Sequence, residues 1–170
     1  MVSDYKEILS DSAKGMKRSA IRELLKLTQK PEIISFAGGL PAKESFPLEQ
    51  LQEICAEVIA TDGAAACQYG STEGVPELLE ILAQRYRDQG LSYVTKENIT
   101  IITSSQQGLD TVGKIFLNRG DKYICELPSY LGALGAFNSY GGVGVGIPQD
   151  EQGMSAVELE KTLAEMKAKG

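Results

Sequence analysis

The chain has 170 residues, and 17 Lys or Arg against 23 Asp or Glu give a formal net charge of −6. This acidic balance argues against a nucleic-acid partner, because such binders carry a basic stripe. Hydrophobic residues make up 42% and charged residues 24%, as in a globular protein rather than a disordered, collagen-like or membrane-spanning one. The sequence contains no His, which excludes imidazole metal sites and Ser-His or Cys-His nucleophile pairs. We expect no metal site, and proton transfer would fall to Lys, Tyr, Cys, carboxylates or a cofactor.

The cysteines and the amino terminus indicate an intracellular setting. Cys55, Cys67 and Cys125 are odd in number and show no CxxC spacing, so we expect small buried hydrophobic residues rather than disulfides or a zinc site. The first thirty residues contain no apolar core of a signal peptide, and no run approaches the roughly 20 apolar residues of a membrane span. The expected location is the cytoplasm.

The first ninety residues predict three helices. Residues 1–30 read as a polar helical segment that ends at Pro31, and a short extended stretch follows at 33–36. A second helix opens near Pro47 and stops at Asp62 and Gly63, and a third ends near Gly90. The residues expected to face inward are Leu51, Ile54, Cys55, Val58 and Ile59 on the second helix, and Leu78, Leu79, Leu82 and Tyr86 on the third.

From residue 98 onward, short β-prone runs alternate with helical patterns. Strands are predicted at 99–103, 122–126 and 143–147, with helices through 109–116 and 130–137, and a last helix capped by Ser155 with Glu158. Strands separated by helices predict βαβ units, a parallel sheet and an α/β fold. The glycines of 141–146 precede Ile147 and Pro148 and open no helix, so we interpret them as a strand closely approached by a neighbour rather than a dinucleotide loop.

The junction at residues 103–108 is the most informative candidate site. The predicted strand ends at Thr103, and Ser104, Ser105 and Gln106 follow as the next helix begins. A helix start offers unpaired N–H groups and the positive end of the helix dipole, so these side chains fit a phosphate cradle. Ser and Thr are also ordinary N-cap residues, and plain capping remains an alternative.

Four motifs in natural order resemble one family. The segments are ISFAGGLP (34–41), QYGSTEG (68–74), ITIITSSQQGLDTVGKIF (99–116) and ELPSYLGALGAF (126–137). Together they resemble the amino-terminal part of fold-type-I, pyridoxal-phosphate-dependent aminotransferases of class I/II, in the branch with 2-aminoadipate aminotransferases and MocR-type regulators. The resemblance implies an incomplete three-layer αβα large domain preceded by an amino-terminal helical arm, with residues 1–45 as arm and small-domain segment and 46–170 as the first part of the coenzyme-binding domain.

The resemblance also implies where pyridoxal 5′-phosphate binds. Ser104, Ser105 and Gln106 fall on the family's phosphate-binding turn, although the family usually has Gly at the position of Ser104. Tyr130 falls on the aromatic residue that stacks on the pyridine ring, where a flat side chain holds the ring plane. The alternative is that Tyr130 is only a core aromatic residue.

Four further residues match family positions. Tyr69 matches the tyrosine that reaches the neighbouring subunit's phosphate in a homodimer, and its alternative is an ordinary loop tyrosine. Gly39 with Gly38 matches the turn near the substrate's α-carboxylate, where a side chain would collide. Arg22 lies on the helix that covers the active site and would clamp a second carboxylate, unless it is simply a solvated charge.

The resemblance implies a parent enzyme that moves an amino group from an amino acid to a 2-oxo acid. The family's Schiff-base lysine has no counterpart here, because no lysine of this chain lies in a Ser-rich turn after a late strand. We therefore expect a fragment, or a chain completed by another polypeptide, that is inactive alone. In the family's sheet, the first of the three strands lies away from the other two, and later strands fill the space between them. We therefore expect residues 1–170 alone to leave a gap in that sheet.

Two other functions are compatible with the sequence. One is a ligand-sensing domain like that of MocR-type regulators, which carry a basic winged-helix domain ahead of this region. The other is an unrelated α/β domain that binds a phosphate or nucleotide at 104–106.

Overall fold

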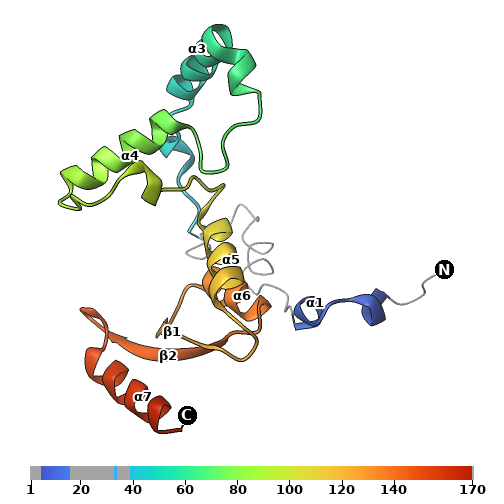
Figure 1. The fold of residues 1–170 in the computed structure, drawn as a ribbon, viewed down its shortest axis with the longest axis vertical. Coiled ribbons are helices and arrows are strands. Elements are labelled where there is room, and N and C mark those ends of the chain that lie inside the picture. The colour runs from blue at the N-terminus through green and yellow to red at the C-terminus, as the bar shows by residue number, and fades with distance from the viewer. Residues whose placement is uncertain (1–4, 16–32, 34–38, 170) are drawn as a thin grey trace. The chain divides into compact units, whose positions relative to one another are not determined.

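The computed structural model describes residues 5–15, 33 and 39–169 of the chain (Figure 1). The chain forms two compact units: Met1–Lys17 together with Ile102–Gly170, and Arg18–Ile101. In the part of the chain that is described, no helix is both long enough and apolar enough to cross a bilayer. The boundary expected between residues 45 and 46 stays a prediction.

Among its described residues, the unit Arg18–Ile101 contains two long helices. After the short 3-10 helix η2 (Lys43–Ser45), α3 spans Leu48–Ala66 and α4 spans Pro76–Asp88, followed by η3 (Lys96–Asn98). Pro47 stands directly before α3, as predicted, because its fixed φ suits a helix start. The predicted end at Asp62 is partly right: Asp62 has non-helical angles (φ −141°, ψ 26°), but helical turns resume and continue to Ala66.

The predicted inward face of α3 is wrong. Its apolar side chains are exposed, with Ile59 59% and Ile54 55% accessible, and Cys55 is exposed as well. A periodic apolar face tells which side of a helix can be buried, but it does not supply the element that covers that side. Cys67 is also exposed and Cys125 is partly buried, so the expectation of three buried cysteines is wrong too.

The packing of α4 follows the prediction more closely. Leu79 is buried, but its buried neighbour is Ala83 rather than Leu78 or Tyr86, which are exposed. The turn after the helix is held by Arg87, whose Nη1 donates to the Val94 carbonyl at 3.0 Å. The helix ends just before Gly90 (φ +95°), where the left-handed conformation favours glycine.

The second unit, Met1–Lys17 with Ile102–Gly170, has the α/β architecture that the sequence predicts. After η1 (Tyr5–Ile8) and α1 (Asp11–Gly15), its elements are α5 (Ser105–Phe116), β1 (Lys122–Leu127), α6 (Leu131–Ser139), β2 (Val143–Asp150), β3 (Gly153–Met154) and α7 (Ala156–Lys169). β1 and β2 pair in parallel, in register from Lys122 opposite Val143, and β3 adds a short antiparallel strand that was not predicted. Figure 1 shows α5 and α6 on one side of the β1–β2 pair and α7 on the other. The start of α7 is capped as predicted, with the Glu158 N–H donating to Ser155 Oγ at 3.4 Å.

The predicted strand at 99–103 does not form in the described structure. The segment is extended at Ile99 (φ −121°, ψ 137°), but it joins no sheet. Its backbone donors bond to turns instead: the Ile99 N–H donates to the Lys96 carbonyl at 3.2 Å and the Ile101 N–H to the Glu73 carbonyl at 2.7 Å. A β-prone run becomes a strand only when a neighbour takes up its N–H and C=O groups, and no described strand does so here.

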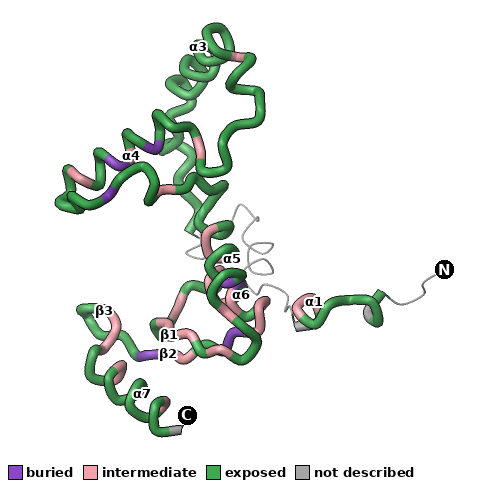
Figure 2. Tube along the Cα trace, in the orientation of Figure 1, coloured by how far each residue is buried: buried purple, intermediate pink, exposed green. Residues whose placement is uncertain are grey.

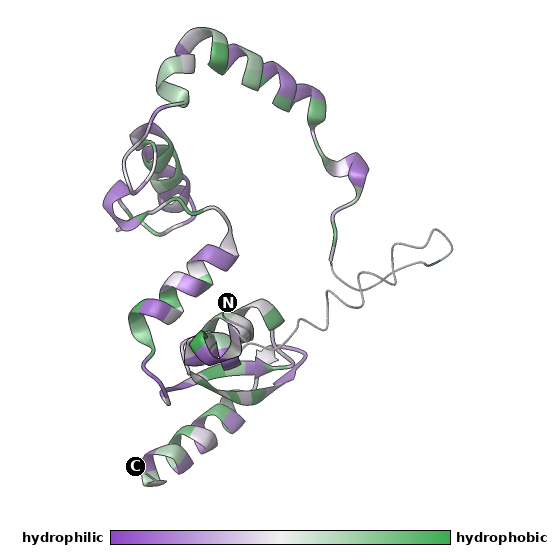
Figure 3. Cartoon of the chain, turned by 90° about the vertical axis from the view of Figure 1, so that its right-hand side faces the viewer, coloured by the Kyte–Doolittle hydropathy of each residue, from purple (hydrophilic) through white to green (hydrophobic). Residues whose placement is uncertain are grey.

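The core around the sheet is small and depends on glycines. Figure 2 shows few buried segments, and Ile147 on β2 is the largest side chain that is fully buried. Figure 3 shows hydrophobic and hydrophilic stretches alternating along the helices. The prediction of a closely approached Gly-rich strand is confirmed, because a Cβ on Gly144 would lie 2.9 Å from Tyr123 Oη, and one on Gly146 would lie 3.3 Å from Leu127 Cβ.

Candidate functional site

The start of α5 exposes backbone donors that no described residue accepts. Ser104 is extended (φ −170°, ψ 172°) and α5 begins at Ser105, with no acidic residue in its first turn. Gln107 Oε1 accepts the Thr103 N–H at 2.5 Å, so this side chain of the first turn bonds to the segment before the helix and not to a first-turn N–H. Within the described residues, the N–H groups of Ser105 and Gln106 have no recorded acceptor. This arrangement favours an anion, which unpaired donors and the helix dipole both stabilise.

Ser104 does not act as a side-chain cap. Its hydroxyl makes no capping hydrogen bond, and residues 104–106 are all exposed. The alternative of plain N-capping by Ser104 is therefore not what the structure shows. No hydrogen bond within the described residues uses the Ser104 or Ser105 hydroxyl, so both remain available beside the N–H groups of Ser105 and Gln106.

The start of α6 presents an exposed aromatic ring. Tyr130 directly precedes α6, at the carboxyl end of β1, where open α/β sheets bind ligands. Gln149 of β2 donates its Nε2 to the Pro128 carbonyl at 2.6 Å and so holds the loop that leads to Tyr130. The Tyr130 side chain is 62% exposed, which does not fit the alternative of a core aromatic residue.

Side-chain bonds bring the two helix starts together. Gln106 Nε2 donates to the Gly132 carbonyl at 3.3 Å, linking the first turn of α5 to the first turn of α6. Farther along the same pair of helices, Tyr140 Oη donates to Asp110 Oδ2 at 3.1 Å. Desolvation, and then the bond to Asp110, raise the pKa of Tyr140. The free donors at 104–106 and the ring of Tyr130 therefore lie at one end of one helix pair.

The other predicted site residues lie in the unit Arg18–Ile101 or outside the described residues. Tyr69 is 99% exposed, on the loop between α3 and α4, with its N–H bonded to its neighbour Gln68. Gly39 has φ +58°, a left-handed conformation that favours glycine, and nothing lies within 4 Å of where its Cβ would stand. Arg22 and Gly38 lie outside the described residues.

Sequence reasoning missed two residues of this site. One is Gln107, whose side chain accepts the Thr103 N–H just before the helix; the other is Gly132, against which the ring of Tyr130 lies. A signal existed for Gly132, since a glycine inside a helical pattern often marks close approach of another group. For Gln107, its position three residues after an N-cap was the available signal.

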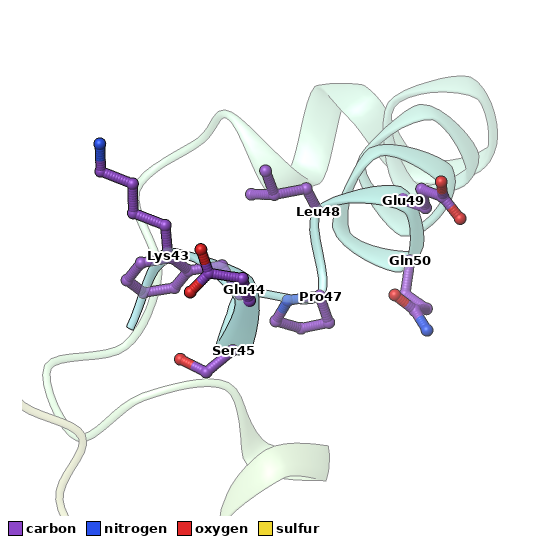
Figure 4. A pocket seen from close by; sticks show the side chains of 8 residues that line it. Lys43, Glu44, Ser45, Pro47, Leu48, Glu49 and Gln50 are labelled. Carbon is purple, nitrogen blue, oxygen red and sulfur yellow. The ribbon is translucent and has the colours of Figure 1, made fainter. Parts of the chain in front are cut away.

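Three surface depressions in the described part of the chain contain none of these residues. One is lined by Lys43, Glu44 and Ser45 of η2 and by the residues from Phe46 to Gln50 at the start of α3 (Figure 4). A single continuous segment forms it, with charges of both signs, and none of the predicted site residues contributes to it. Among the described residues, no three His, Cys, Asp or Glu side chains stand together as metal ligands would.

Comparisons with known proteins point to one family. A family model described as "Aminotransferase class I and II" matches residues 31–170. The chain is 44% identical to aromatic-amino-acid aminotransferase 1 of Thermococcus litoralis over 98% of its own length and 40% of the relative's. It is 42% identical to 2-aminoadipate transaminase of Thermus thermophilus over 94% of its length and 38% of that protein's.

A solved structure agrees with these relatives. The chain superposes with a TM-score of 0.85 and 40% identity on Pyrococcus horikoshii kynurenine aminotransferase, which was solved in complex with PMP, kynurenine as substrate and KYA as product. That alignment covers 100% of this chain and 42% of the other. The chain thus spans about two fifths of the length of the proteins it matches.

Proposed function

Because the chain belongs to the class I and II aminotransferases, we propose that the protein moves an amino group from an amino acid to a 2-oxo acid, with pyridoxal 5′-phosphate as its coenzyme. Pyridoxal phosphate is the coenzyme of this family. The observation that supports the proposal is the Gln106–Gly132 bond, which joins the first turn of α5, with its unused N–H groups, to the first turn of α6, which Tyr130 precedes. A coenzyme with a phosphate on one side and a flat ring on the other needs these two features within one small region.

The residues present fit this coenzyme. Free N–H groups at Ser105 and Gln106, with the hydroxyls of Ser104 and Ser105, offer donors to a phosphate, and the first turn of α5 has no carboxylate to compete. The exposed ring of Tyr130 offers a stacking surface. When bound, the coenzyme supplies the electron sink for the amino acid's α-carbon. This chain's own residues bind the phosphate, orient the ring and leave the ring's edge groups free.

Three roles extend the proposal beyond this helix pair. Tyr69, almost fully exposed, would donate to the phosphate of a neighbouring subunit in a homodimer. Gly39 would let the substrate's α-carboxylate approach the backbone, and Arg22 would bind a second substrate carboxylate. We assign the Schiff-base role to no lysine of this chain. Cytoplasmic location and the boundary near residue 45 belong to the same proposal.

The two other functions have less support. Relatives above 40% identity carry the names of aminotransferases, which favours an enzyme over the sensing domain of a regulator. A nucleotide also has a phosphate and a flat ring, so the helix start of α5 and Tyr130 would suit it too, but a nucleotide-binding domain would not account for the family match over residues 31–170.

Spectroscopy of the full-length protein with its coenzyme tests the function. We expect a visible absorbance band that shifts when an amino donor is added, and formation of a new amino acid from a 2-oxo acid. Aromatic amino acids, kynurenine and 2-aminoadipate are the first donors to try, because the relatives are named for them. A colourless full-length protein that binds ATP instead would contradict the proposal.

Two neighbouring glutamines give a matched test of the phosphate site. Gln106→Glu and Gln107→Glu each add one negative charge to the first turn of α5, but Gln107 is held away from the ligand by its bond to the Thr103 N–H. We expect Gln106→Glu to weaken coenzyme binding far more than Gln107→Glu, whose carboxylate keeps the same acceptor role. Equal losses in the two variants would contradict the assignment of Gln106 to the phosphate site.

A further inference from the structure

The ring of Tyr130 occupies the space that a side chain on Gly132 would need. A Cβ built on Gly132 would lie 2.5 Å from Tyr130 Cε1, 2.6 Å from its Cζ and 2.7 Å from its Oη. Real Cβ atoms do not approach other heavy atoms this closely, so any larger residue at 132 must displace the ring. The ring is otherwise largely exposed, and it therefore has room to swing away.

The same glycine also meets the phosphate side of the site. Its carbonyl accepts Gln106 Nε2 from the first turn of α5 at 3.3 Å. Gly132 thus leaves room for the Tyr130 ring because it has no side chain, and it bonds to Gln106 through its backbone carbonyl. An added methyl group would act on the first contact, because the carbonyl remains in place.

We propose that Gly132 is a positioning residue for the coenzyme ring: its lack of a side chain lets the Tyr130 ring lie over the start of α6, and the orientation of that ring sets the affinity for the coenzyme's pyridine ring. This inference rests on the proposed function, since it assumes that Tyr130 faces the coenzyme. It adds a residue that makes no direct contact with the ligand and acts through its neighbour.

Gly135 provides a matched control in the same helix. It lies one turn farther along α6, and nothing stands within 4 Å of where its Cβ would be. Gly132→Ala and Gly135→Ala gain the same intrinsic helix propensity. Any difference between the two variants therefore reports the contact with Tyr130.

The experiment measures equilibrium binding of pyridoxamine 5′-phosphate to the full-length protein, because this form of the coenzyme binds without a covalent bond. We expect Gly132→Ala to raise its Kd about three- to tenfold, the range for loss of an aromatic stacking contact. We expect Gly135→Ala to leave the Kd unchanged. The Kd for inorganic phosphate, measured by phosphorus NMR, should be the same in all variants, because the α5 donors are untouched.

A double-mutant cycle separates positioning from a merely structural role. In a Tyr130→Ala background, Gly132→Ala should have no further effect, because the ring through which it acts is gone. An effect that persists there would overturn the inference, as would equal Kd values for Gly132→Ala and Gly135→Ala or a parallel loss of phosphate binding. If Gly132→Ala does not fold, Tyr130→Ala should restore folding by removing the clash, and a double variant that stays unfolded would also overturn it.

The outcomes keep the two proposals apart. A wild-type protein that binds pyridoxamine phosphate, with Gly132→Ala behaving like Gly135→Ala, removes only the role of Gly132. A wild-type protein that does not bind the coenzyme removes the proposed function, and this inference with it.

Discussion

Tyr130→Ala distinguishes a ligand-facing tyrosine from a tyrosine that holds the core together. The ring is 62% exposed, and its recorded close contact is with Gly132. Truncating a buried aromatic residue costs about 3–5 kcal/mol, whereas an exposed substitution usually stays within about 0.5 kcal/mol. From the exposure of the ring, we expect Tyr130→Ala to lower the free energy of unfolding by at most about 1 kcal/mol. Coenzyme affinity should fall several-fold, because the stacking surface is lost.

Phe137→Ala is the matched comparison. Phe137 lies on the same helix and is partly buried, with its ring 5.0 Å from that of Tyr123 in an edge-to-face arrangement at 71°. Its truncation should cost about 3 kcal/mol, at the lower end of the buried range because the side chain is only partly covered. It should affect coenzyme affinity little as long as the protein remains folded, since this ring faces β1 rather than the helix starts.

The assay is urea unfolding of the full-length variants, combined with titration of pyridoxamine 5′-phosphate. The slope of the unfolding curve should stay constant, so the shift in midpoint reports the change in stability. If Tyr130→Ala destabilises the protein as much as Phe137→Ala does and leaves coenzyme affinity unchanged, then Tyr130 is a core residue and our interpretation of its exposure is mistaken.

Two further predictions concern the fold. Gly74→Ala should lower the free energy of unfolding, measured in urea, by about 1–3 kcal/mol more than Gly90→Ala does. Both glycines have a positive φ (+125° and +95°), but a Cβ on Gly74 would lie 2.5 Å from Ile101 Cγ1, whereas a Cβ on Gly90 would meet nothing within 4 Å. Equal losses would show that backbone conformation alone matters. Burial raises the pKa of Tyr123 above its ordinary 10.0. On alkaline titration the tyrosine therefore ionises first in the unfolded chain, so the free energy of unfolding is unaffected below about pH 10 and falls as the pH rises above it. Tyr123→Phe should weaken this alkaline loss, as urea midpoints at rising pH will show, and an unchanged pH profile would contradict the assignment.

The sequence predicted the elements whose packing and pairing partners are among the described residues. The helix and strand from Ser105 to Leu127 and the helix after Tyr130 appear close to their expected limits, because glycines and Pro128 bound them and the β1–β2 pairing satisfies both strands locally. The strand at 99–103 failed for the opposite reason. Its composition favours extension, but composition does not provide a partner.

Burial was harder to predict than secondary structure. Ile54 and Ile59 have the right spacing for a buried helix face, and yet both are exposed. Spacing is a property of one helix, whereas burial depends on what lies opposite. For the candidate site, the pattern located the start of α5, but the bond from Gln106 to Gly132 joins residues 26 positions apart, and no local pattern encodes such a contact.

The pairing of Tyr123 with Gly144 carries a consequence for how this sheet can vary. The two residues face each other across β1 and β2, and the phenol fills the space that a side chain on the opposite strand would take. The two positions therefore share a single volume and must change size in opposite directions. Among homologous sequences, a bulky residue at one of them should accompany a small residue at the other, and exchanging the two residues should preserve the sheet better than enlarging Gly144 alone.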